Sequence, residues 1–133
     1  MDIVHHFSVN TQWLGNLGSG TSDYRSYGRQ NLVTADGKAA IDGSSAKPFR
    51  GDPARWNPEE LLIAALSQCH MLSYLHVAVM NGIVVTEYSD AATGTMQQTN
   101  DGGGHFTSVT LRPMVTISAG DADLALALHS EAN

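Results

Sequence analysis

The chain has 133 residues, of which 42% are hydrophobic, which is enough for one globular domain with a core and too few for two ordinary domains. Thirteen acidic residues against seven Lys and Arg give a net charge of −6, and no run of basic residues occurs. This charge pattern excludes nucleic acid and anionic membrane surfaces as expected partners, and it favours solubility. We predict a single domain over residues 1–133.

The N-terminal segment MDIVHHFSVNTQW lacks a basic region followed by an apolar stretch, so it does not resemble a signal peptide. The longest apolar region, residues 61–85, is interrupted by polar residues such as Ser67, Gln68 and His70, which argues against a membrane span. One cysteine forms no internal disulfide and suits a reducing compartment. A cytoplasmic location is therefore expected.

Residues 1–50 alternate short β-like segments with turns. VHHFSV, YRSYGRQNLV and KAAIDG fit strands, and they are separated by the Gly-rich segment GNLGSG and a DG turn. The Gly-rich segment is only superficially like a phosphate-binding loop, because Gly20 stands where that loop needs a lysine. We therefore predict two or three hairpin-like β segments and interpret the glycines as a turn.

A long helix is predicted over residues 58–80. Asn57 suits the N-cap, Pro58 suits the first helical position, Glu60 completes a capping box, and an Asn-Gly pair follows the last turn. Apolar side chains lie nearly all around this helix, which predicts burial on most sides. So small a domain does not easily surround so long a helix, and we expect a second copy of the chain to supply the missing cover in a homodimer.

Two alternating patterns follow, IVVTEYSDAATGTMQQ and HFTSVTLRPMVTIS, and the polar segment TNDGGG joins them. Together they predict a β-hairpin. The last segment, DADLALALHSEAN, begins with acidic residues and predicts a second helix. The order of strands, long helix, strand pair and helix is typical of an α+β domain.

The only cysteine, Cys69, lies in the predicted long helix, directly before His70 and seven residues before His76. A metal site is not favoured, because on a helix Cys69 and His76 stand roughly 10 Å apart along the axis and His70 is rotated by about 100°. A hydrolase with one of these histidines as base meets the same difficulty. The alternatives left are an inert core cysteine and a reactive thiol, with no metal or cofactor expected.

A cation near Cys69 would activate it, because a guanidinium favours the thiolate over the thiol. Arg50 and Arg55 precede the helix, and Arg29 lies in the strand region. An arginine in an apolar site needs an anionic partner, and Glu59 is available because the next glutamate belongs to the capping box. Glu59 and Cys69 are separated by about 15 Å along one helix, so a shared site favours antiparallel helices from two chains.

Three stretches of the sequence carry a resemblance to a known family. They are WxGNxGxGTxxYxxYxR over residues 13–29, FRGDPARWNPEELLIAALSQCHMLSYLH over residues 49–76, and GxFTxVTLRPxVTI over residues 104–117. The chain resembles the OsmC/Ohr family, the osmotically inducible and organic hydroperoxide resistance proteins. The likeness spans nearly the whole chain, and the NPEELLIAALSQC stretch is its specific part.

The resemblance implies an α+β fold in which antiparallel sheets wrap around a long central helix in an intertwined homodimer, with two sites at the interface. Cys69 would attack the O–O bond of an organic hydroperoxide and become a sulfenic acid. Glu59 would orient the activating arginine, which is Arg50 in an OsmC-like placement and Arg29 in an Ohr-like one. The expected apolar lining for the substrate comes from Phe49, Met71 and Leu72.

Two-cysteine members of the family carry a resolving cysteine after the C-terminal helix. This chain stops at LHSEAN, a few residues before that position, so either it is shortened or it lacks the second thiol and needs an external thiol reductant. We expect a stress-response antioxidant, a thiol peroxidase acting on small organic hydroperoxides. The alternative is a non-catalytic dimer that binds an apolar small molecule in the same interfacial cavity.

Overall fold

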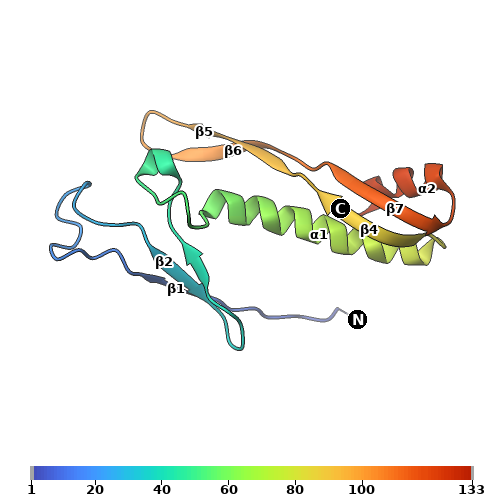
Figure 1. Ribbon diagram of the computed structural model, residues 1–133, viewed down its shortest axis with the longest axis horizontal. Helices are drawn as coiled ribbons and strands as arrows, with labels where there is room; N and C mark the ends of the chain where they lie inside the picture. The colour runs from blue at the N-terminus through green and yellow to red at the C-terminus, as the bar shows by residue number, and fades with distance from the viewer. Residues whose placement is uncertain (1, 133) are drawn as a thin grey trace. The chain divides into compact units, whose positions relative to one another are not determined.

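A computed structural model describes residues 2–132 (Figure 1). The chain divides into two compact units, Met1–Leu61 and Leu62–Asn133, and each is described by itself. The elements in chain order are β1 (Asn10–Trp13), β2 (Asn31–Thr34), β3 (Ile41–Gly43), the 3₁₀ turn η1 (Lys47–Phe49), α1 (Pro58–Met80), β4 (Val84–Asp90), β5 (Thr93–Gln98), β6 (Gly104–Thr110), β7 (Pro113–Ala119), α2 (Ala122–Ala127) and the 3₁₀ turn η2 (Leu128–Glu131).

The first unit contains a three-stranded antiparallel sheet in the order β1-β2-β3. Arg55 joins its strands, because its guanidinium donates to the carbonyl of Gly43 at 2.8 Å and to that of Asn31 at 3.2 Å. The same guanidinium lies 3.6 Å from the carboxylate of Asp42. Arg55 therefore stabilises the sheet.

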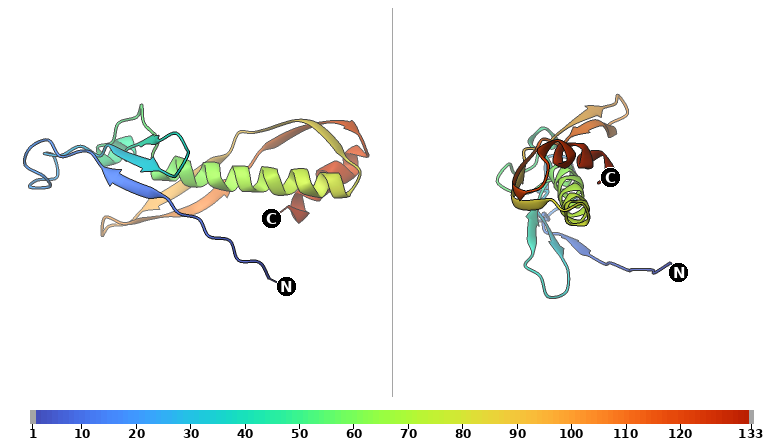
Figure 2. Two further views of the ribbon diagram at one scale, coloured as in Figure 1. Left: turned by 90° about the horizontal axis from the view of Figure 1, so that it is seen from below. Right: turned by 90° about the vertical axis from the view of Figure 1, so that its right-hand side faces the viewer.

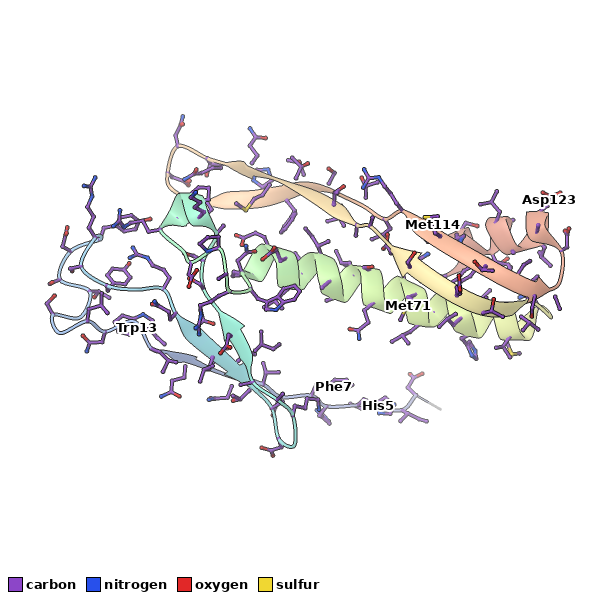
Figure 3. All side chains as sticks on the ribbon, viewed as in Figure 1. His5, Phe7, Trp13, Met71, Met114 and Asp123 are labelled. Carbon is purple, nitrogen blue, oxygen red and sulfur yellow. The ribbon has the colours of Figure 1, made fainter. Side chains whose placement is uncertain are left out.

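The strand predicted for VHHFSV is absent, because residues 2–9 contain no helix or strand and β1 begins at Asn10. Figure 3 labels His5 and Phe7 in this segment, and 93% of Phe7 is exposed. Alternating apolar residues form a strand only where a neighbouring strand accepts their backbone hydrogen bonds. The pairing of β1 with β2 starts at Asn10, opposite Thr34.

The Gly-rich segment forms a turn, as predicted. The side-chain oxygen of Asn16 accepts hydrogen bonds from the backbone N–H groups of Gly18 and Gly20, both at 3.0 Å. The φ angles of these two glycines are 129° and 60°, a region that side-chain-bearing residues rarely adopt. The glycines are therefore needed for the shape of the turn.

The predicted bounds of the long helix are confirmed by α1. Asn57 accepts from the backbone N–H of Glu60 at 2.9 Å, and the Glu60 carboxylate accepts from the N–H of Asn57 at 3.3 Å, which completes the capping box. At the other end Gly82 has φ 72°, and the N–H of Ile83 donates to the carbonyl of Ala78 at 2.9 Å.

The second unit is built on a long, interrupted β-hairpin, which confirms the predicted strand pair. β5 pairs with β6 next to the loop, and β4 pairs with β7 further along, so the structure divides each predicted strand into two. Figures 1 and 2 show β4 and β7 alongside α1, with α2 following β7. Asp90 accepts from the Ser67 hydroxyl on α1 and from the N–H of Arg112, both at 2.6 Å, where the strands are interrupted.

The core of the second unit gathers around Tyr74, which is fully buried. The other buried apolar residues are Ala78, Ile83, Ala125, Leu128 and Ala132. Asp121 caps α2 by accepting from the N–H of Leu124 at 3.1 Å. The second predicted helix is confirmed, with its last turn in 3₁₀ form.

The expectation that the long helix is buried on most sides is wrong for the single chain. Only Tyr74 and Ala78 of α1 are buried among the described residues, whereas Leu62, Leu66 and Leu72 are exposed. By length and apolar composition α1 would also fit a membrane span. Its open face therefore needs a cover from outside the chain.

Candidate functional site

Cys69 is a free, exposed thiol on the open face of α1. It lines a pocket of about 360 Å³ in the second unit. The other lining residues are Leu66, His70, Val109, Leu111 and Ala132. Apart from the thiol itself, the only side chain of this lining that forms hydrogen bonds is the imidazole of His70, so the pocket suits an apolar molecule with one polar group.

A stack of three rings lies beside this pocket. The Nε2 atom of His70 on α1 and the Nδ1 atom of His129 on η2 are 3.1 Å apart, a hydrogen-bond distance. The His129 ring stacks on that of Tyr74 with centroids 4.0 Å apart and an interplanar angle of 7°. The Tyr74 hydroxyl donates to the carbonyl of Ala125 at 2.7 Å. The rings are therefore held from three elements of the second unit.

Burial and the neighbouring His70 lower the pKa of His129, because both disfavour the imidazolium form. Burial raises the pKa of Tyr74 and keeps its hydroxyl protonated. The His70–His129 pair therefore contains a histidine that stays neutral near neutral pH, with a single hydrogen between the two facing nitrogens.

The arginines predicted near the thiol, Arg29 and Arg50, lie in the first unit. The Arg29 guanidinium stands over the rings of Tyr27 and Tyr24, with its carbon 3.8 Å and 4.5 Å from their centroids. It also donates to the backbone carbonyls of both tyrosines. Arg50 is exposed and has φ 64°. Arg29 is thus oriented by cation–π contacts, whereas Arg50 stands on a surface turn.

Glu59 is partly buried on the first turn of α1, and its Oε2 atom is buried without a hydrogen-bond partner. A buried carboxylate oxygen without a donor is energetically unfavourable. Glu60, the neighbouring carboxylate, belongs to the capping box as predicted. Glu59 therefore stays the candidate for holding an arginine.

The three residues predicted to bind substrate, Phe49, Met71 and Leu72, do not line the Cys69 pocket. Phe49 belongs to η1 of the first unit, and Met71, which Figure 3 labels, is half-buried on α1. Their role in binding remains a prediction. The pocket residues on the β-hairpin were missed, because nothing local in the sequence indicates that Val109 and Leu111 face Cys69.

Within residues 2–132 no group of three His, Cys, Asp or Glu side chains is arranged to hold a metal ion. His70 and Cys69 line one pocket, although they are rotated apart on α1. His70 hydrogen bonds with His129, a pairing that sequence reasoning did not include.

The fold and this site define an α+β protein in which a long helix presents a single thiol beside an apolar pocket. The family model for OsmC-like protein matches residues 51–132. The chain therefore belongs to the OsmC-like family, which confirms the resemblance carried by the NPEELLIAALSQC helix. A comparison with curated proteins gave no match.

Solved structures confirm the OsmC-like fold. An OsmC-like protein of unknown function from Vibrio cholerae is 29% identical, with a TM-score of 0.83 over 97% of this chain and 88% of that one. An organic hydroperoxide resistance protein from Elizabethkingia anophelis, solved with crystallant-derived thiocyanate bound, is 20% identical, with a TM-score of 0.66 over 98% and 84%. An organic hydroperoxide resistance protein from Legionella pneumophila is 21% identical, with a TM-score of 0.66 over 97% and 84%.

Proposed function

We propose that this protein is a cytoplasmic thiol peroxidase that reduces small organic hydroperoxides through Cys69. The observation that carries the proposal is an exposed thiol in a largely apolar pocket. Membership in the OsmC-like family supports a role in redox chemistry or peroxide resistance. Apolar contacts with Leu66 and Val109 would bind the organic part of the substrate and place its peroxide group beside the thiol.

The proposed chemistry has three balanced steps. The Cys69 thiolate attacks the terminal oxygen of ROOH, the O–O bond breaks, and a sulfenic acid and the alkoxide RO⁻ result. The alkoxide takes up one proton, which balances the proton that Cys69 lost on forming the thiolate, and leaves as ROH. One external thiol then condenses with the sulfenic acid to a mixed disulfide and releases water. A second external thiol displaces Cys69 and leaves as the oxidised disulfide. The proposal assigns reduction to external thiols because the 133 residues contain one cysteine.

The proposed active form is a homodimer in which α1 helices cover each other. This arrangement is supported by the exposed leucines along α1 and by its open apolar face. Membership in the OsmC-like family favours a second chain over lipid as the cover. In such a dimer Glu59 and Arg29 or Arg50 of one chain would complete the site at Cys69 of the other, which would give the buried Oε2 atom of Glu59 its missing donor.

Intact-protein mass spectrometry with the sulfenic-acid reagent dimedone tests this function. Treatment with one equivalent of cumene hydroperoxide is expected to add one dimedone to the wild-type chain, with none on Cys69→Ser. The chain offers a single thiol, so the adduct needs no further assignment. An unmodified wild-type thiol under these conditions would exclude the peroxidase function.

A second candidate function, binding of an apolar small molecule without catalysis, is favoured by a pocket in the first unit. This pocket measures about 420 Å³ and contains no cysteine or histidine. Its lining consists of Thr11, Trp13, Asn31, Val33, Ser44, Trp56, Pro58 and Leu61. Native mass spectrometry that finds a retained apolar molecule, together with an unreactive Cys69, would support binding instead of peroxide reduction.

A further inference from the structure

We propose that His70 is a further catalytic residue, the proton donor to the alkoxide that leaves when Cys69 attacks a hydroperoxide, and that His129 is its positioning residue. The inference rests on the proposed function of Cys69. Its basis is the place of His70, which lines the same pocket as the thiol and pairs with His129 on η2.

The pairing determines which nitrogen serves the pocket. Nε2 of His70 is engaged with Nδ1 of His129 at 3.1 Å, so Nδ1 of His70 is the nitrogen left for a molecule in the pocket. When His129 Nδ1 carries the shared hydrogen, His70 accepts it at Nε2 and must carry its own hydrogen at Nδ1. In this tautomer the pocket contains a hydrogen-bond donor.

The stack fixes the positions of the two rings, and we assign the shared hydrogen to His129 Nδ1. His129 lies flat on Tyr74, whose hydroxyl is anchored to the carbonyl of Ala125, and the His70 ring is nearly parallel to that of His129, at 14°. Within residues 2–132 neither imidazole has a carboxylate partner, so the donor ability of His70 depends on His129 alone. His129 also lines a second pocket, of about 220 Å³, through which a proton can return from solvent.

The proton transfers balance without a charged imidazole as a product. As the S–O bond forms and the O–O bond breaks, the alkoxide takes the hydrogen from His70 Nδ1. His70 takes the shared hydrogen at Nε2 from His129 Nδ1, and His129 takes a proton from water at Nε2. The proton that Cys69 lost to solvent on forming the thiolate balances the one gained, so the sum is thiol plus ROOH giving sulfenic acid plus ROH.

The test compares two oxidants by stopped-flow oxidation of Cys69. The leaving group from cumene hydroperoxide is a strongly basic alkoxide, which needs a proton. The leaving group from peracetic acid is a weakly basic carboxylate, which does not. His70→Gln keeps a polar group toward His129 but removes the donor at the Nδ1 position. It is expected to slow the reaction with cumene hydroperoxide on the order of 100-fold and that with peracetic acid less than about threefold.

Three further variants complete the test. His70→Asn keeps a hydrogen-bond donor at the Nδ1 position, but its amide does not release a proton, so it is expected to slow the reaction with cumene hydroperoxide about as strongly as His70→Gln does. His129→Phe keeps the stack on Tyr74 and is expected to lose about tenfold with cumene hydroperoxide only, because a positioning residue acts through the donor. The exposed His76 does not line the pocket, and His76→Gln is expected to change neither rate.

Equal slowing of both oxidants by His70→Gln, or slowing of neither, would overturn the role of His70 while the peroxidase function stands. A wild-type protein that reacts with cumene hydroperoxide no faster than free cysteine would instead overturn the proposed function. Alkylation of Cys69 by iodoacetamide at the wild-type rate would show that the surroundings of the thiol are unchanged in each variant. If His70→Gln fails this control, His70→Asn is used in its place to test the role of His70.

Discussion

The phenol of Tyr74 on α1 donates a 2.7 Å hydrogen bond to the backbone carbonyl of Ala125 on α2. Tyr74 is the fully buried centre of the second unit, and its ring carries the stacked His129. One side chain thus joins the long helix, the C-terminal helix and the histidine pair beside Cys69.

Removing this hydroxyl is expected to destabilise the protein without opening a large cavity. Tyr74→Phe should lower the free energy of unfolding by about 1–2 kcal/mol, because the buried carbonyl of Ala125 loses its donor. Urea denaturation followed by circular dichroism measures the loss. Tyr24→Phe is the matched control, since Tyr24 is exposed and a phenylalanine ring keeps the cation–π contact with Arg29. The free energy of unfolding is expected to change by less than about 0.5 kcal/mol.

The stability is expected to fall as the pH drops below about 6.5, the ordinary pKa of histidine. Burial and His70 lower the pKa of His129, so between its folded and unfolded pKa values the unfolded chain binds more protons. Stability from the neutral His129 is therefore complete above the unfolded pKa and is lost as the pH falls through the folded pKa. Urea midpoints measured across this range should show the loss, and His129→Phe should flatten it. An equal pH dependence in the variant would contradict this assignment.

Alanine substitutions of the two adjacent glutamates at the start of α1 are expected to have different effects. Glu59→Ala should slow oxidation of Cys69 by cumene hydroperoxide on the order of 100-fold, because an arginine that completes the site would lose its orientation. Glu60→Ala should leave that rate unchanged and cost about 1 kcal/mol of stability through the lost capping box. Stopped-flow kinetics and urea denaturation of both variants separate the effects. Similar rates for the two variants would argue against a role for Glu59.

The open face of α1 is expected to be the dimer contact. Leu72 is 57% exposed in the single chain, and Leu72→Lys should shift the protein from dimer to monomer, because a lysine ammonium is costly to bury at an apolar interface. Sedimentation velocity measures the shift. Leu126→Lys, on the exposed side of α2, is the control and should remain dimeric. A Leu72→Lys protein that sediments as the wild type would place the interface elsewhere.

Much of the fold was predictable because its signals are local. The bounds of α1 follow from Asn57, Glu60 and Gly82, whose capping interactions lie within one helical turn of each end. The turn at Gly18 and Gly20 was predictable because glycine readily adopts the positive φ angles found there. The strand pair was predictable from the alternation of apolar and polar residues. The strand predicted before Asn10 failed, because alternation alone supplies no partner for the backbone hydrogen bonds.

The candidate site was predictable only in part. Cys69 was singled out on the predicted helix, but the rest of the pocket lining was not, since Val109 and Leu111 approach Cys69 through the fold of the hairpin. The role of Glu59 stays a prediction. The His70–His129 contact joins residues 59 positions apart, and no spacing on a helix indicates it. Helical geometry rotates the adjacent side chains of Cys69 and His70 apart, yet both line one pocket.

Reduction of organic hydroperoxides by Cys69 is tested most directly by the second-order rate constant for its oxidation by cumene hydroperoxide, compared with hydrogen peroxide and with free cysteine. Burial of about 60 Å² of apolar ligand surface is worth about 1.5 kcal/mol, roughly tenfold in rate if it is retained in the transition state. Cys69 is expected to react at least about tenfold faster with cumene hydroperoxide than with hydrogen peroxide, and faster than free cysteine with either. A Cys69 that reacts like free cysteine with both oxidants would contradict a peroxidase function.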